Sequence, residues 1–264
     1  MRYNIKYLLS ALFVFLAFSV QSARGQVGDY RHVWAIGVSG GVALNSIGFT
    51  PEVSQNMHNG YSFGITARYT SEKYFSTICS IQTEVNISQL GWKEDIKTLS
   101  GGDVINPETG VAEQYKRDIT YLQIPIMAHL AWGKEKNGIN AFINAGPQLG
   151  FFLSEKTTKN YNKPYTKDNF PDYVGGEERV SVEVAQEDMP IERKFDYGIA
   201  VGGGIEFSHP KVGHFILEGR YYYGLGDIFK NSKSDFFGRS NFGQIVIKAT
   251  YLFDIIRTKN DKIK

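Results

Sequence analysis

The chain has 264 residues, of which 42% are hydrophobic and 14% aromatic, with 29 basic and 27 acidic side chains. This near balance leaves no basic excess of the kind that binds nucleic acid, and the single cysteine, Cys79, excludes an internal disulfide and a thiolate metal site. We therefore expect no nucleic-acid partner, no metal site and no cofactor.

The first 25 residues have the composition of an export signal. Arg2 and Lys6 precede an apolar run from Leu8 to Val20, and the small-residue pattern Ala23-Arg24-Gly25 follows the run. The run is shorter than the about 20 residues that a membrane-spanning helix needs. We expect residues 1–25 to be a secretory signal peptide cleaved after Gly25; the alternative is an uncleaved membrane anchor.

Eight later segments alternate with period two, which predicts β-strands. Their ranges are 33–44, 61–70, 75–90, 115–132, 138–153, 194–208, 212–224 and 241–253. One face of each segment is apolar, as in Val38, Ile65 and Val85, whereas the other face is small or polar. Charges fall within the polar faces: Arg68, Glu84, Glu206, Glu218, Arg220 and Lys248. A soluble sandwich would turn such charges to water, whereas a barrel in lipid turns them inward.

The connections between these segments alternate strictly between long and short. The short ones run over 70–75, 132–138 and 207–212, and the long ones over 45–60, 91–114, 154–193 and 225–240. Short periplasmic turns and longer outer loops are typical of bacterial outer-membrane barrels, which close because lipid cannot satisfy an open sheet edge. We predict an eight-stranded antiparallel transmembrane β-barrel, a meander with periplasmic termini, over residues 26–253. Residues 254–264 would form a short polar periplasmic tail.

The interior of an eight-stranded barrel holds its own side chains and little else. We therefore expect Arg68, Glu84, Glu206, Glu218, Arg220 and Lys248 to pair in one closed polar network, because buried charges need partners. The alternative, a conducting pore, is disfavoured by the same size argument. Pro125 and Pro147 each remove a backbone donor from adjacent strands, which predicts bulges or a local break.

The segment 154–193 is the longest connection, and loops of this length are usually functional or disordered. Residues 179–186 alternate enough to predict an extended hairpin above the membrane. Asp168, Asp172, Glu177 and Glu178 offer oxygen ligands for Ca²⁺, but their spacing matches no calcium loop, and a solvated charged surface is the favoured interpretation.

Two groups of residues allow a catalytic or a nucleotide-binding interpretation as well as a structural one. His129, His214 and Glu218 could serve as acid, base or nucleophile partners, but no serine near either histidine completes an obvious triad. The glycines at 198 and 202–204 lie within a predicted strand that is followed by another strand, whereas a phosphate loop needs a strand before it and a helix after it. Close packing or strand curvature explains them better.

Several stretches resemble the PorT-type family of outer-membrane β-barrel proteins. They are Tyr121-Leu122-Gln123-Ile124-Pro125-Ile126, Asn144-Ala145-Gly146-Pro147-Gln148-Leu149-Gly150, the segment 195–207 and Glu218-Gly219-Arg220-Tyr221-Tyr222-Tyr223-Gly224-Leu225. The resemblance covers nearly the whole mature chain and implies an eight-stranded barrel in the outer membrane of a Gram-negative cell. The founding member is associated with type IX protein secretion. Unlike barrels that finish on an aromatic residue, this chain continues from Asp254 to Lys264 after Phe253.

From these observations we expect a non-enzymatic, monomeric outer-membrane protein with a filled lumen, without catalytic residues. Its function would be structural in the envelope, or would lie in partner binding by the outer loops. Its partners would be outer-membrane lipid and envelope or secretion proteins. The alternatives are a subunit of a type IX-like secretion machine and, third, a lipid-modifying enzyme.

Overall fold

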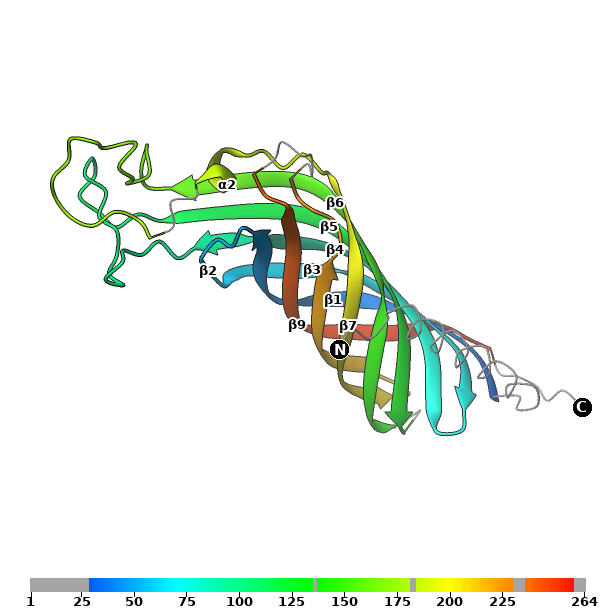
Figure 1. Cartoon of the computed structure of the whole chain (residues 1–264). Helices are drawn as coiled ribbons and strands as arrows, with labels where there is room; N and C mark the ends of the chain where they lie inside the picture. The colour runs from blue at the N-terminus through cyan, green and yellow to red at the C-terminus, as the bar shows by residue number, and fades with distance from the viewer. Residues whose placement is uncertain (1–28, 135–136, 181–183, 230–235, 259–264) are drawn as a thin grey trace, which may run out of the picture.

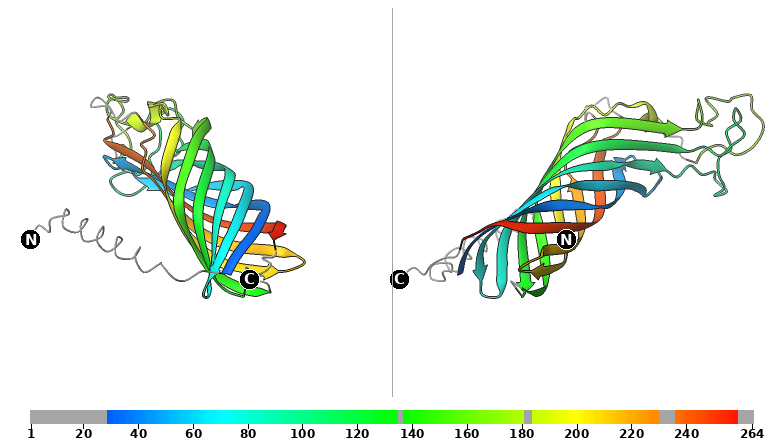
Figure 2. Two further views of the ribbon diagram at one scale, coloured as in Figure 1. Left: turned by 90° about the vertical axis from the view of Figure 1, so that its right-hand side faces the viewer. Right: turned by 180° about the vertical axis from the view of Figure 1, so that it is seen from behind.

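The computed structural model describes residues 29–134, 137–180, 184–229 and 236–258, and within them one antiparallel sheet closes into a ring (Figures 1 and 2). Eight long strands form the ring: β1 (Asp29–Thr50), β3 (His58–Tyr74), β4 (Thr77–Glu94), β5 (Tyr115–Gly133), β6 (Gly138–Lys159), β7 (Phe195–His209), β8 (Gly213–Gly224) and β9 (Arg239–Thr258). Each long strand pairs with the next along the chain, and β1 pairs with β9. The predicted eight-stranded antiparallel barrel is confirmed.

Two small elements accompany the ring. The strand β2 (Gln55–Asn56) pairs with the end of β4, and the single helical turn α2 (Ala185–Asp188) lies in the connection between β6 and β7. The prediction of an extended hairpin over 179–186 is therefore wrong at Ala185 and Gln186. In the part of the chain that the structure describes, no helix has the length and apolar character to cross a membrane.

The alternation of side chains follows the predicted faces. Val38 is 62% exposed and Ile65 is 57% exposed on the outside of the ring, whereas Thr66 and Glu84 are buried inside it. A strand places successive side chains on opposite faces, so the outer surface becomes an apolar band. Such a band suits hydrocarbon rather than water.

The strands extend further than the alternation predicts, mostly at the end with the long loops. β1 reaches Thr50 instead of residue 44, β4 reaches Glu94 instead of 90, and β6 reaches Lys159 instead of 153. Beyond the apolar band the outward side chains become polar, so the sequence loses its period-two signal while backbone pairing continues. Short connections join the expected pairs of strands, over 75–76 between β3 and β4 and over 210–212 between β7 and β8, while β5 ends at Gly133 and β6 begins at Gly138. The first connection lies later than predicted, because β3 continues to Tyr74 instead of ending at Thr70. Residues 135–136 lie outside the described part.

The last strand also runs past its predicted end. Asp254 to Thr258, which we assigned to the polar tail, continue β9 by pairing with the beginning of β1. The register of β1 and β9 shifts between Trp34 and Ala35, so that Asp254 points inward and Ile256, two residues later, points outward. The period-two pattern of the sequence is therefore lost in this part of the strand. The predicted signal peptide, residues 1–25, and the last tail residues, 259–264, lie outside the described residues.

The prolines interrupt the ladder without shifting its register. Pairing between β4 and β5 is missing where Glu84 and Val85 face residues 124–125, and pairing between β5 and β6 is missing where residues 126–127 face 146–147. On their other sides Pro125 pairs with Gln148 and Pro147 with Ile199. The expected local break is present, because proline lacks an N–H, but neither site is a bulge.

Candidate functional site: barrel interior and outer lobe

Four of the six predicted interior charges form one group in the middle of the barrel. This central charge group comprises Glu84, Glu218, Arg220 and Lys248, all at most 5% exposed. Both terminal nitrogens of Arg220 donate to Glu84 at 3.0 and 2.8 Å, and its Nε donates to Glu218 at 2.6 Å. Lys248 Nζ donates to Glu84 at 2.5 Å. Two carboxylates thus face two cations, so the group is electrically neutral.

The other two predicted charges lie nearer the short turns. This lower charge group contains Arg68, Glu206, His214 and Asp254. Arg68 binds Glu206 through two hydrogen bonds of 2.6 and 2.9 Å. His214 Nδ1 lies 2.7 Å from Glu206, and its Nε2 lies 3.2 Å from Asp254. The predicted single network is therefore two groups, and sequence reasoning missed Asp254 because it placed that residue outside the last strand.

Wall glycines make room for the central charge group. A Cβ added at Gly202 would lie 2.6 Å from Asn144 Oδ1 and 3.1 Å from Glu218 Oε1, and one at Gly64 would lie 2.4 Å from Asn86 Oδ1. Asn144 and Asn86 donate to Glu218 and Glu84 respectively. The glycines at these positions therefore serve close packing, in line with the structural interpretation of the cluster at 198 and 202–204.

A cluster of large side chains fills the mouth of the barrel at the long-loop end. This aromatic plug contains Tyr121, Tyr222 and Phe242 on inward strand positions, together with Phe49, Trp92, Phe229 and Phe237, all buried. Tyr121 meets Phe242 edge to face, with ring centroids 5.4 Å apart. Tyr222 donates to Asp196 at 2.6 Å, which gives its buried hydroxyl a partner. The plug and the two charge groups lie at successive levels along the inside of the barrel.

A serine lies beside the histidine and the aspartate of the lower charge group. Ser208 Oγ lies 2.9 Å from His214 Nδ1, and Asp254 lies 3.2 Å from His214 Nε2. In a hydrolytic triad one ring nitrogen must accept the serine proton. Here each nitrogen lies within hydrogen-bond distance of a carboxylate oxygen, from Glu206 or Asp254, and Ser208 itself donates to Glu206 at 3.0 Å. Ser208 and His214 thus share the Glu206 carboxylate, an arrangement that differs from a triad in which the serine donates to the histidine alone.

His129 and His214, the two histidines weighed for catalysis, both lie inside the barrel. His129 is 1% exposed, and neither ring nitrogen has a hydrogen-bond partner; its Nε2 lies 3.6 Å from Glu206. Its ring packs on Phe142 with centroids 4.6 Å apart.

Above the barrel, β4, β5 and β6 continue together and carry a folded unit made of the long connections (Figure 1). We call it the outer lobe: residues 95–114, 160–180 and 184–193. Its centre is the buried guanidinium of Arg179, whose Nε donates to Glu113 at 2.5 Å and whose Nη1 donates to Glu187 at 2.8 Å. The Cζ atom of Arg179 lies over the ring of Tyr161, 4.9 Å from its centroid, and the Tyr161 hydroxyl donates a hydrogen bond of 2.8 Å to Glu187. These contacts tie three loop segments into one structure.

Glu94 lies at the root of the outer lobe, beyond the apolar band. It is 7% exposed and accepts hydrogen bonds from Gln186 at 3.1 Å and from the Trp92 indole at 3.4 Å. Burial, and after it the neighbouring Glu187 carboxylate, together raise the pKa of Glu94 to about 7. Glu94 therefore titrates near neutral pH.

We expect the outer lobe to lose stability as the pH rises between the ordinary pKa of Glu94, 4.5, and its folded value of about 7. The folded state holds the Glu94 proton more tightly than the unfolded state does. The stability gained from this proton is therefore complete at pH values below the ordinary pKa, and it is lost as the pH rises through the pKa of the folded state. The shift corresponds to about 3 kcal/mol. Hydrogen exchange of the backbone amides of residues 95–114, corrected for the intrinsic exchange rate at each pH, measures this change in the stability of the lobe. Glu94→Gln should give a flat profile; an equally flat wild-type profile would contradict the assignment.

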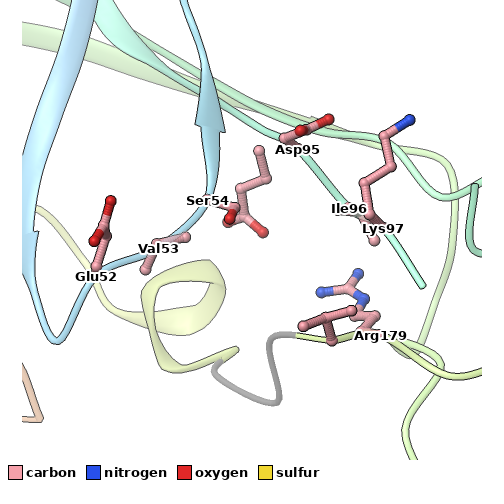
Figure 3. A pocket seen from close by; sticks show the side chains of 9 residues that line it. Glu52, Val53, Ser54, Asp95, Ile96, Lys97 and Arg179 are labelled. Carbon is pink, nitrogen blue, oxygen red and sulfur yellow. The ribbon is translucent and has the colours of Figure 1, made fainter. Parts of the chain in front are cut away.

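A hollow of about 380 Å³ opens at the root of the outer lobe (Figure 3). It lies between residues 52–54, which connect β1 to β2, residues 94–97 at the end of β4, and residues 179–180. Its walls carry both signs of charge: Glu52 and Asp95 against Lys97 and Arg179. Lys97 is already paired with Asp103 at 2.6 Å.

The acidic residues weighed as calcium ligands do not converge. Glu177 accepts hydrogen bonds from the Ser100 backbone and hydroxyl, and Glu178 pairs with Lys167. Over the described ranges, no group of three or more histidine, cysteine or acidic side chains has the geometry to hold a metal ion.

Comparison with solved structures finds small outer-membrane proteins of low sequence identity. The attachment invasion locus protein Ail of Yersinia pestis, in complex with the heparin analogue sucrose octasulfate, is 12% identical, with 83% of this chain and 99% of that chain covered and a TM-score of 0.33. Neisserial surface protein A is 11% identical over 83% and 97%, with a TM-score of 0.37. OprG of Pseudomonas aeruginosa is 12% identical over 86% and 99%, with a TM-score of 0.38.

Comparison with curated proteins gives no match. A family model described as the outer membrane protein beta-barrel domain matches residues 20–230, which is most of the chain. The match agrees with the closed ring, its apolar outer band and its charged interior. The chain therefore belongs to the outer membrane protein beta-barrel domain family and resides in the outer membrane.

Proposed function

We propose that this protein is a non-enzymatic envelope component whose barrel is a closed anchor and whose outer lobe binds another protein. The observation that carries the proposal is the construction of the lobe. Its loops are organised around the buried contacts of Arg179 with Glu113 and Glu187, although loops without a role need no such order. Apolar side chains are exposed on the same loops: Leu99, Ile105, Val111 and Val174.

The filled interior supports an anchor rather than a channel. The aromatic plug and the two charge groups leave the lumen occupied by side chains at each level. The hydrogen bonding of His214 and the burial of Ser208 likewise support a structural role for the lower charge group. The resemblance to PorT-type proteins adds a secretion machine as the class of partner to look for.

Photo-crosslinking in intact cells tests this proposal. A photoreactive amino acid at Leu99 or Val174, which are 88% exposed and fully exposed respectively, should give one adduct of discrete mass. The same group at Lys211, in a short turn at the opposite end of the barrel, is the matched control. Identification of the adduct as a secretion subunit would select the machine alternative. Absence of any lobe-specific adduct would overturn partner binding.

A further inference from the structure

The outer face of β4, β5 and β6 changes chemistry in regular steps above the apolar band. Paired residues of neighbouring strands share a face, so the register gives successive rows. Ile87, Leu122 and Phe151 form an apolar row, and Gln89, Thr120 and Ser154 form a neutral polar row above it. The next two rows carry Asp118 with Lys156, and then Lys93 with Lys116. These three lysines with Asp118 are the lysine face.

The lysine face has an excess of positive charge that the protein does not neutralise. Lys116 pairs with Asp118 at 2.8 Å, and Asp118 also accepts from His58 at 2.6 Å. Lys93 and Lys156 are exposed and have no ion pair with any described residue. Moreover, Lys93 lies directly opposite Lys116 in the register. Like charges directly opposite each other destabilise a sheet, so an anion between them would remove a cost that the sheet otherwise bears.

The height of the lysine face matches the headgroup layer of the membrane. Four residues separate Ile87 from Gly91, which is in the Asp118 row, and this is about 14 Å along a strand. With the usual tilt of barrel strands, the lysines begin about 10 Å above the apolar row. Lysine stems bend back along apolar surface to keep the ammonium at the interface. The side chains therefore reach the layer where lipid phosphates lie.

We propose that the lysine face binds the phosphate groups of an anionic lipid in the outer leaflet. The lysine face has three ammonium groups and one carboxylate, so its net charge is positive. Such a surface attracts a lipid headgroup with more than one phosphate more strongly than a zwitterionic headgroup, which has no net charge. The face points outward from the barrel, so its ligand lies beside the protein and not in the lumen. This inference needs only an inserted barrel, and it is independent of what the outer lobe binds.

The test measures lipid binding to the intact protein in nanodiscs of phosphatidylcholine with and without lipid A. Wild-type protein should retain lipid A in native mass spectrometry, and the triple variant Lys93→Gln/Lys116→Gln/Lys156→Gln should bind it about 100-fold more weakly, at about fivefold per lysine. The control variant Lys134→Gln/Lys211→Gln changes two lysines in short turns at the opposite end, and its affinity should equal that of wild type.

Three results would overturn the proposal: no preference of wild type for lipid A, an equal loss in the control variant, or an undiminished affinity of the triple variant. Each single substitution is measured as well, so that a folding defect of the triple variant cannot stand in for lost binding. Inorganic phosphate added to the lipid A nanodiscs separates the sources. Displacement by millimolar phosphate would indicate a free-anion site and overturn the lipid assignment.

Discussion

Glu84→Gln should destabilise the barrel more than any other single substitution in its interior. Glu84 accepts from Arg220 and Lys248 and also from Gln82 and Asn86, so the substitution leaves two buried cations against one carboxylate. Breaking a buried pair by removing one partner costs about 3–5 kcal/mol, because an uncompensated charge remains. Urea unfolding in lipid vesicles, followed by the electrophoretic shift between unboiled and boiled samples, measures the loss.

A second substitution separates charge balance from packing at this site. Glu84→Gln/Lys248→Met removes one charge of each sign and leaves Arg220 paired with Glu218 at 2.6 Å. The double variant should therefore regain much of the stability that Glu84→Gln loses. Lys97→Met, which breaks the exposed pair with Asp103, should leave unfolding unchanged. A double variant as unstable as the single one would show that the neutrality of the central charge group is not what stabilises it.

Arg179→Met should unfold the outer lobe and leave the barrel intact. The substitution removes the common partner of Glu113 and Glu187, whose side chains are almost wholly buried, and leaves two carboxylates without their cation. A local loss of about 3–5 kcal/mol follows from the same rule for broken buried pairs. Limited proteolysis should cut the lobe within residues 95–114 and 160–180, while the heat-dependent electrophoretic shift persists.

The control for this prediction is Lys167→Met, which breaks the exposed pair with Glu178 in the same loop. It should leave the proteolytic pattern of the wild type. If Arg179→Met abolished the electrophoretic shift as well, the lobe and the barrel would unfold as one cooperative unit, which would contradict this prediction. The proposed crosslink from Val174 should also disappear in Arg179→Met if the partner recognises the folded lobe.

The barrel itself could be predicted from sequence because one rule governs most of it. Alternation of apolar and polar residues fixed which faces of the strands point to lipid, and the long and short connections gave their order. The rule gives no information where both faces are apolar or both polar. Tyr121, Tyr222 and Phe242 lie on inward positions of their strands. They are an odd number of residues away from the outward Leu122, Tyr221 and Ile245, and this spacing was the available signal for the aromatic plug.

Partners far apart in sequence were the part that could not be predicted. Arg68 and Glu206 are 138 residues apart, and Arg220 and Glu84 are 136 apart. A closed ring brings opposite strands within side-chain reach, but which charges meet depends on stagger and side-chain rotamer. In the outer lobe, Arg179, Glu113 and Glu187 follow no periodic pattern at all, so only the three-dimensional structure reveals them as a set.

The strands β4, β5 and β6 run from the short turns up to the outer lobe, and their hydrogen bonding is interrupted only near Pro125 and Pro147. This arrangement has a mechanical consequence. A force that pulls on the lobe along the strands loads many backbone hydrogen bonds at once, in shear, and does not peel them apart one after another. The lobe therefore has no flexible tether at this junction, and the whole ring bears the load. A partner attached to the lobe would be held at a fixed height and angle above the cell surface.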